Sequence, residues 1–144
     1  MRRQMLRFLQ KRKFRLVTQW KRALKDHIGF QLPNHGEFPF RLIFRCLDEV
    51  IFLLKHDELE PDPYARPTFV DQLDKENPPN ADQYMELFLS GREVLVDFIS
   101  SDPSFCKWFP KEERDRLCAA VEIAIKALIH REMISYSRRY QHSY

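Results

Sequence analysis

The pattern of apolar and polar positions predicts helices along most of this chain. The longest pattern runs from Pro110 to Tyr136, where an almost unbroken apolar stretch occupies the middle. A helix that is apolar on nearly every side has to be covered by other elements. We therefore expect an all-α fold, a four- to five-helix bundle packed around this long apolar C-terminal helix. The apolar residues at its centre are Val121, Ile123, Ala124, Ile125, Ala127, Leu128 and Ile129.

Apolar residues that recur every three or four positions predict three more helices ahead of it. Their expected bounds are about Arg2 to His27, about Pro39 to His56 and about Asn80 to Ser100. Gly29 would end the first, as a glycine after a helix commonly does. Gly91 lies in the middle of the third, where either a close helix crossing or chance would account for it.

Polar residues on the second helix mark the side that we expect to face solvent. Arg45 and Glu49 are four positions apart there, a spacing at which they could pair along the surface for about 0.5 kcal/mol. The expected solvent-facing residues are Arg41, Arg45, Asp48, Glu49 and Lys55.

A Pro-rich acidic loop over 57–80 separates the second and third helices. Within it, Thr68 to Glu76 could form a short helix, with Thr68 and Asp71 as its N-terminal cap. A connection of this length inside a compact domain is often functional. The apolar residues that the short helix would carry are Phe69, Val70 and Leu73.

A second irregular stretch, Pro103 to Phe109, is rich in aromatic residues. We expect Phe105, Trp108 and Phe109 to cover one end of the core. The chain closes with a tail, 137–144, that is expected to be flexible. The length of 144 residues fits a single domain, 1–144.

Charge is unevenly distributed, although the net charge is only +3. The first 25 residues of the basic amphipathic helix at 1–28 include ten Lys or Arg and no acidic residue. The region from Asp48 to Glu86 holds eleven Asp or Glu against three basic residues. Such polarity can serve a partner, or the two parts can face each other within a fold or a dimer.

No arrangement of residues points to an enzyme, and we name no catalytic residue. The three cysteines lack the spacing of a zinc site and are expected to be free, buried thiols, so we expect no metal and no cofactor. His130 leaves one alternative, because a buried histidine in a helical sensor could ligate haem iron. The other interpretation of His130 is a hydrogen-bonded residue at the edge of the core. The cysteines are Cys46, Cys106 and Cys118.

No run approaches the ~18 apolar residues of a membrane span, so we expect no transmembrane segment and a cytoplasmic location. The acid-free, Arg-rich start is also a feature of organellar transit peptides. Its lack of Ser and its Trp20 favour a packed helix instead.

The basic first helix supports two binding hypotheses. Its cations could neutralise the phosphates of nucleic acid or of an anionic surface, although no turn motif places a second helix for groove reading. Its surplus apolar residues could instead contact a protein partner or a second copy, which makes a homodimer. The anion-binding candidates are Arg12, Lys13 and Arg15. The contact candidates are Phe8, Phe14 and Trp20.

Three segments resemble a known family. They are "FRLVTQWKRAL" around Trp20, "QYMELFLSGREVLVDFI" (Gln83 to Ile99) and "AAVEIAIKALIHREMISY" (Ala119 to Tyr136). Together they are similar to the opening, central and closing helices of the N-terminal sensory domain of stressosome co-antagonist (RsbR-like) and related bacterial histidine-kinase proteins. The chain departs from that family at Gln83 and Tyr84, where many members carry a histidine-containing segment. We expect no kinase or phosphoacceptor module within these 144 residues.

The resemblance implies a non-catalytic, helical, dimeric input domain that biases an output domain. Our hypothesis from the sequence is a regulatory, sensory or protein-interaction module of bacterial signal transduction that works through helix packing and dimerisation. Nucleic-acid or anionic-surface binding through the first helix is the alternative, and a haem or small-ligand sensor is the third.

Overall fold

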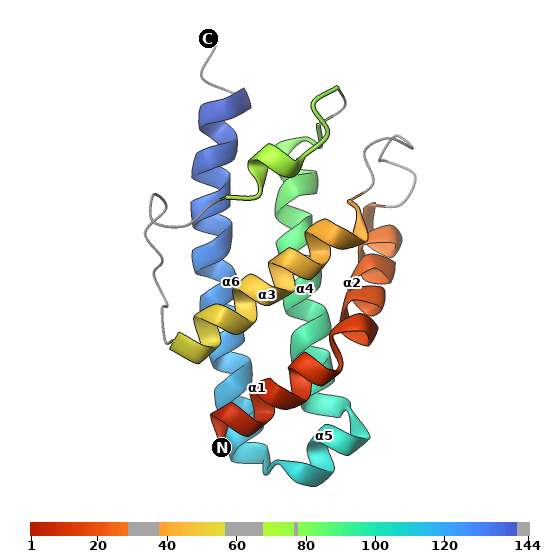
Figure 1. Ribbon diagram of the computed structural model, residues 1–144, viewed down its shortest axis with the longest axis vertical. Coiled ribbons are helices and arrows are strands. Elements are labelled where there is room, and N and C mark those ends of the chain that lie inside the picture. The colour runs from red at the N-terminus through yellow and green to blue at the C-terminus, as the bar shows by residue number, and fades with distance from the viewer. Residues whose placement is uncertain (29–37, 57–67, 77, 141–144) are drawn as a thin grey trace.

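The computed structural model describes residues 1–28, 38–56, 68–76 and 78–140. These residues form six α-helices and one 3₁₀ turn and contain no strand, so the predicted all-α class is confirmed (Figure 1). The elements are α1 (Arg2–Lys11), α2 (Lys13–Ile28), α3 (Phe40–His56), η2 (Val70–Gln72), α4 (Ala81–Ser101), α5 (Pro103–Trp108) and α6 (Lys111–Tyr140).

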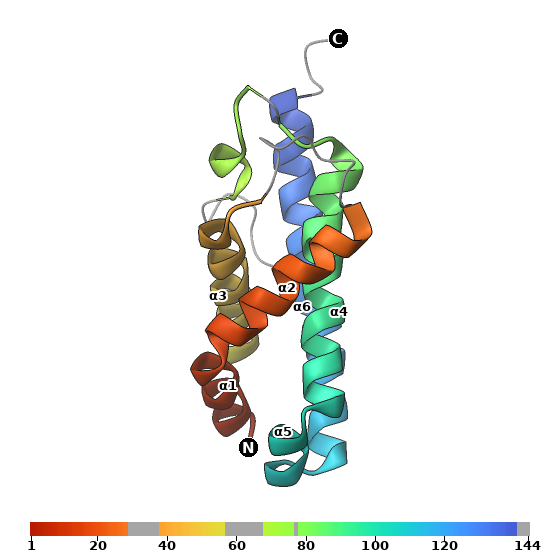
Figure 2. The ribbon, with the colours of Figure 1, turned by 90° about the vertical axis from the view of Figure 1, so that its right-hand side faces the viewer.

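Four long helices form the sides of a bundle (Figure 1, Figure 2). Going round it, α2 packs against α4, α4 against α6, α6 against α3, and α3 against α2. The short α1 extends the side begun by α2 and packs on α3, while α5 packs on α4 at the turn into α6. The core lies between these sides, and most of its volume comes from Leu, Ile, Val and Phe side chains.

The C-terminal helix α6 is one side of this bundle, with a single buried stripe and an outward face. Leu117, Val121 and Leu128 on the stripe are fully buried, whereas Ile123 on the outward face is 47% exposed. The expectation that its apolar middle is covered on most sides is therefore wrong at Ile123. Single apolar residues on a protein surface are common and need no cover. The helix continues to Tyr140, so 137–140 is helical, and 141–144 of the predicted tail lies outside the described residues.

The direction of the helices explains the long connection between α3 and α4. Both helices run the same way along the bundle, while α2 and α6 run the opposite way (Figure 1). The end of α3 therefore lies far down the bundle from the start of α4, and a long connection is needed between them (Figure 1). Of that connection, the structure describes 68–76 and 78–80.

The predicted first helix is two helices, α1 and α2, which meet at Arg12. The Arg12 backbone has φ −109° and ψ 16°, outside the helical range, and its N–H donates to the Leu9 carbonyl at 3.0 Å. Because no proline or glycine marks this position, the break could not be read from the local sequence. The change of direction lets α1 follow the C-terminal half of α3 while α2 crosses α4. The Arg12 guanidinium lies over the Phe8 ring, 4.8 Å from its centroid.

Side-chain caps define the ends of α4 and α5. Asn80 and Gln83 form a reciprocal capping box at the start of α4, with hydrogen bonds of 2.8 and 2.9 Å. Asp102 accepts a 3.0 Å hydrogen bond from the Phe105 N–H at the start of α5 and pairs with Arg15 of α2 at 3.2 Å. This one carboxylate therefore joins α2 to the corner between α4 and α5.

The aromatic end of the core matches expectation in part. Phe105 and Phe109 are buried and pack edge-on against Phe8 of α1, with ring centroids 5.4 and 6.1 Å apart. Trp108, however, is 70% exposed, so its predicted place over the core is wrong. The reason is that α5 has only six residues, of which Phe105 alone is buried.

Candidate functional site

A charged cluster lies in the core where the buried stripe of α6 changes from apolar to ionic residues. The stripe reaches Leu128, and the next two residues on the same face are Arg131 and Glu132. Both side chains are buried, at 1% and 0% exposure. Ionised groups are rarely buried without partners, because their removal from water is costly. The surroundings of these two residues therefore define the candidate site.

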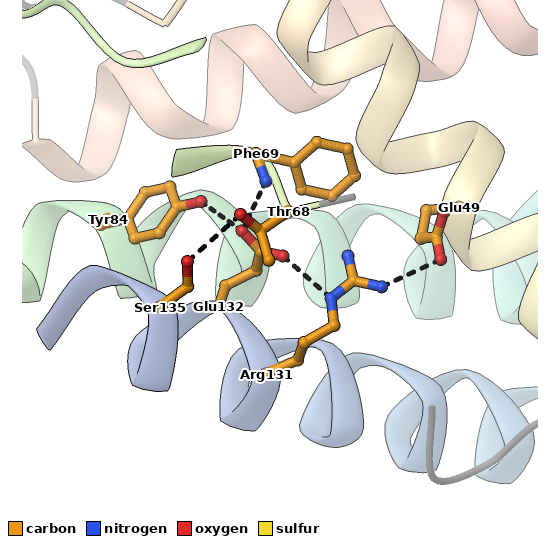
Figure 3. Close-up of polar contacts among 7 residues, drawn as sticks. All are labelled: Glu49, Thr68, Phe69, Tyr84, Arg131, Glu132 and Ser135. Carbon is orange, nitrogen blue, oxygen red and sulfur yellow. Dashed lines mark hydrogen bonds and ion pairs between the residues drawn. The ribbon is translucent and has the colours of Figure 1, made fainter. Parts of the chain in front are cut away.

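Three helices and one loop segment supply the partners of this cluster (Figure 3). Arg131 donates from Nη1 to Glu49 Oε1 on α3 at 3.1 Å and from Nε to Glu132 Oε2 at 2.9 Å. The other oxygen of Glu132, Oε1, accepts from the Tyr84 hydroxyl on α4 at 2.7 Å and from the Phe69 backbone N–H at 2.8 Å. The cluster thus connects α3, α4, α6 and the segment that contains η2.

The described residues 68–76 and 78–79 are held along the same edge of α6 by further polar contacts. Thr68 and Ser135 share a hydrogen bond of 3.2 Å, and the Tyr136 hydroxyl donates to the Pro79 carbonyl at 2.7 Å. Arg139 pairs with Asp71. The predicted short helix is only the 3₁₀ turn η2, whose N-cap residue makes no side-chain cap, so the Thr68–Asp71 cap is wrong. Both side chains bond to α6 instead.

Arg131 is the one cation among the described residues of this cluster. One guanidinium faces two carboxylates, and Arg131 Nη2 is buried without a hydrogen-bond partner among the described residues. The Arg131 guanidinium also lies over the Phe69 ring, 5.5 Å from its centroid. Buried donors without partners are uncommon in folded proteins, so this arrangement is held at a cost in stability.

Burial shifts the pKa values of the groups around Arg131. Burial raises the pKa of Glu132 above its ordinary value of 4.5, against the lowering effect of its hydrogen bonds to Tyr84 and Phe69 and of Arg131. Burial, followed by the negative charge of Glu132, raises the pKa of Tyr84 far above 10.0. The same two causes raise the pKa of Cys46, so the thiol next to the cluster stays protonated and is a poor nucleophile.

The predicted solvent side of α3 is wrong at Glu49. This residue is only 8% exposed and bonds to Arg131, 82 positions away in the chain. Its spacing from Arg45 suggested a surface pair, and local sequence held no sign of the distant partner. The sequence of α6 did contain a usable signal. Apolar residues recur there every three or four positions, at Leu117, Val121, Ile125 and Leu128, and the next position in this series is Glu132. A charge on a core stripe requires a buried counter-charge.

The three predicted contact residues occupy different environments. Phe14 is 73% exposed on α2, where its ring lies 6.5 Å from that of Phe44 on α3. Phe8 is half-buried among the aromatic rings near α5. Trp20 is completely buried and donates from Nε1 to the Leu87 carbonyl of α4 at 2.7 Å, which gives it an internal role. Of the three, only Phe14 presents a large apolar surface to solvent, and the contact role itself stays a prediction.

The three predicted anion-binding residues all make contacts within the chain. Lys13 pairs with Asp48 of α3, and Arg15 pairs with Asp102 while lying over the Phe98 ring at 5.6 Å. Arg12 lies over Phe8. Their binding of an external anion stays a prediction, and it would compete with these internal partners.

The remaining candidate, His130, is exposed on the outward face of α6 and takes no part in the buried cluster. Among the described residues, no group of three or more His, Cys, Asp or Glu is placed to hold a metal ion. The three cysteines are free, as expected, but only Cys46 is buried, and the other two are partly exposed.

Within the described ranges, no helix is long and apolar enough to cross a membrane. Comparison with protein families, with curated proteins and with solved structures finds no match for this chain.

Proposed function

We propose that this chain is a non-catalytic regulatory module of signal transduction, in which a change of helix packing is transmitted to a protein partner. The observation that carries the proposal is the hydrogen bond from the Phe69 N–H to the buried carboxylate of Glu132. Through Arg131, that carboxylate is linked to Glu49 on α3. A surface segment is therefore connected to the centre of the bundle by three consecutive polar contacts.

Because of this connection, we expect the helix packing to change between discrete arrangements and not continuously. When the segment moves away, the buried Glu132 carboxylate loses the Phe69 N–H as a donor, which costs about 1–3 kcal/mol. Intermediate positions of the segment, in which Phe69 no longer donates to Glu132, are therefore unfavourable. Two distinct packings separated by such a barrier are what a regulatory module requires. The segment is also accessible, because Asp71, Asp74 and Glu76 are exposed on it.

Dimerisation belongs to the same proposal, and an aromatic seam between α2 and α3 supports it. Phe14 and Phe40 are among the large exposed hydrophobic residues, at 73% and 41%. Phe44, partly buried, follows Phe40 by one helical turn and approaches Phe14. Exposed aromatic residues that lie together mark contact surfaces more often than isolated ones do.

The decisive experiment perturbs one end of the connection and observes the other. Glu49→Gln weakens the ion pair with Arg131 on α3, and hydrogen exchange of the Phe69 amide reports on the segment. We expect faster exchange at Phe69 in the variant, although the two residues do not share a hydrogen bond. The matched control is Asp48→Asn, which removes the neighbouring carboxylate that pairs with Lys13 at the surface. Its Phe69 amide should exchange as in the wild type.

The same variants test whether a partner responds to the packing. Wild type, Asp48→Asn and Glu49→Gln are each used as bait in an extract of the source cells. Wild type and Asp48→Asn should retain the same amount of a partner protein, and Glu49→Gln should retain a different amount. The proposal is contradicted if Glu49→Gln leaves the Phe69 amide unchanged, or if no retained protein distinguishes it from the control.

A further inference from the structure

We propose that the groove between α1 and the C-terminal end of α3 binds an acidic, amphipathic segment of a partner protein. The proposal rests on the proposed function in one respect, namely that the partner is a protein. The groove has a volume of about 990 Å³. It is lined by Arg2, Arg3, Leu6, Arg7 and Gln10 of α1 and by Ile51, Leu54, Lys55 and His56 of α3.

Two helices bring positive charge together at this groove. Three arginines come from α1, and Lys55 comes from the last turn of α3, where the neighbouring His56 also lines the groove. None of the described lining residues is acidic. In the described part of the chain, no carboxylate pairs with Arg3, Arg7 or Lys55, in contrast to Lys13 and Arg15 farther along. The groove proposed here thus lies apart from Arg12, Lys13 and Arg15, whose binding of an anion stays a prediction.

Apolar residues also line the groove. Leu6, Ile51 and Leu54 form this part of the lining, called the floor below, with 5%, 3% and 1% of their surfaces exposed. An occupant that fits both features has carboxylates at its edges and one or two apolar side chains toward the floor. Arginine forks recognise carboxylates in a bidentate geometry, and amphipathic segments commonly bind in grooves of this kind.

A single-stranded nucleic acid fits the groove less well. Such strands are held by aromatic side chains on which successive bases stack. The only ring in the described lining is that of His56, which already packs against Phe52 with centroids 4.3 Å apart. The observations therefore favour a peptide over a nucleic acid as the occupant.

The test measures the fluorescence anisotropy of a short labelled peptide. Its Leu residues recur every three or four positions, and Glu residues lie between them. Saturable binding is expected at low salt and should weaken as salt rises. Arg7→Glu and Lys55→Glu should each weaken binding by about tenfold, because each replaces a charge-assisted contact with a repulsion. Arg22→Glu is the matched control, since Arg22 is an exposed cation on α2 outside the groove. It should bind as the wild type does.

Three outcomes would overturn the proposal. The first is an absence of saturable peptide binding, and the second is equal binding of a peptide with Gln in place of Glu. The third is tighter binding of a single-stranded oligonucleotide or of anionic phospholipid vesicles, with the same loss in Arg7→Glu. Circular dichroism melts of each variant establish that the fold is retained. Exchange at Phe69 in the same samples tests the proposed function separately, because that amide is not part of the groove.

Discussion

The indole ring of Trp20 occupies the space that a side chain at Gly91 would need. A Cβ added at Gly91 would lie 2.2 Å from Cζ2 of Trp20, far inside van der Waals contact. The ring cannot easily turn aside, because its Nε1 is hydrogen-bonded to the Leu87 carbonyl. Of the two explanations that the sequence allowed for Gly91, the close helix crossing is therefore the right one.

We expect Gly91→Ala to destabilise the protein. The clash with Trp20 should cost about 1–3 kcal/mol and outweigh the gain of up to about 1 kcal/mol from replacing a helical glycine. In a Trp20→Leu background the clash is absent, so the same substitution should be neutral or stabilising. Urea unfolding of the two single variants and the double variant measures this coupling. Equal effects of Gly91→Ala in both backgrounds would contradict the prediction.

Arg131→Met should be strongly destabilising. The substitution leaves Glu49 and Glu132 buried without their counter-charge, at a cost of about 3–5 kcal/mol. Arg116→Met provides the comparison, because Arg116 pairs with Glu113 on an exposed part of the same helix. Loss of that pair should cost less than about 1 kcal/mol. Denaturant midpoints distinguish the two cases, and similar losses for both variants would show that the buried cluster contributes little.

The ionisation of Glu132 should give stability a pH dependence of definite sign. Burial raises the pKa of Glu132 above 4.5, so the native state binds this proton more tightly than the unfolded chain does. The resulting stabilisation is fully present below about pH 4.5 and is lost as the pH rises through the native pKa. The Glu132→Gln variant lacks this titrating carboxyl group. The difference in unfolding free energy between wild type and Glu132→Gln should therefore become smaller from acid to neutral pH.

Unfolding free energies of Glu132→Gln, wild type and Glu122→Gln across this pH range provide the measurement. Glu122 is an exposed carboxylate on the same helix, and its variant should follow the wild type. A constant or growing difference between Glu132→Gln and wild type would refute the assignment.

The oligomeric state should depend on Phe14. Light scattering after size exclusion should give a dimer for the wild type and a monomer for Phe14→Glu, because the introduced charge falls on the aromatic seam. Trp108→Glu places the same charge at another exposed aromatic residue, 70% exposed on α5, and should remain dimeric. A wild type that is monomeric at every concentration, or a Trp108→Glu variant that dissociates equally, would count against the seam.

Local sequence patterns were sufficient to predict the bounds of two helices, but they did not predict the break at Arg12 or the buried ion pair. The bounds of α3 and α4 follow from apolar spacing, from Pro39 and from the Asn80 cap, all of which act within a few residues. The break at Arg12 has no such marker, since it accompanies a change in tertiary packing: α1 and α2 both pack on α3, and α2 also packs on α4. The pair Glu49–Arg131 joins positions 82 residues apart, so it depends on the tertiary arrangement alone.

The groove illustrates the same limit. Arg3 and Arg7 are visible in the sequence as part of a basic helix, but their meeting with Lys55 and His56 depends on how α1 follows α3. Sequence reasoning named Arg12, Lys13 and Arg15 as the anion-binding candidates of the basic first helix. Folding supplies internal partners to all three, and it leaves the positive charge at the far end of the helix accessible.

The ion pair between α3 and α6 also selects one alignment of these helices over its neighbours. Leu, Ile and Val side chains along both helices could interdigitate almost as well after a slip of one turn, about 5.4 Å. Such a slip would separate Arg131 from Glu49 and pull Glu132 away from Tyr84 and from Phe69. Three ionised groups would then be buried with the wrong neighbours. The buried cluster thus makes one register of α3 against α6 more stable than the neighbouring registers in a core that is otherwise chemically repetitive.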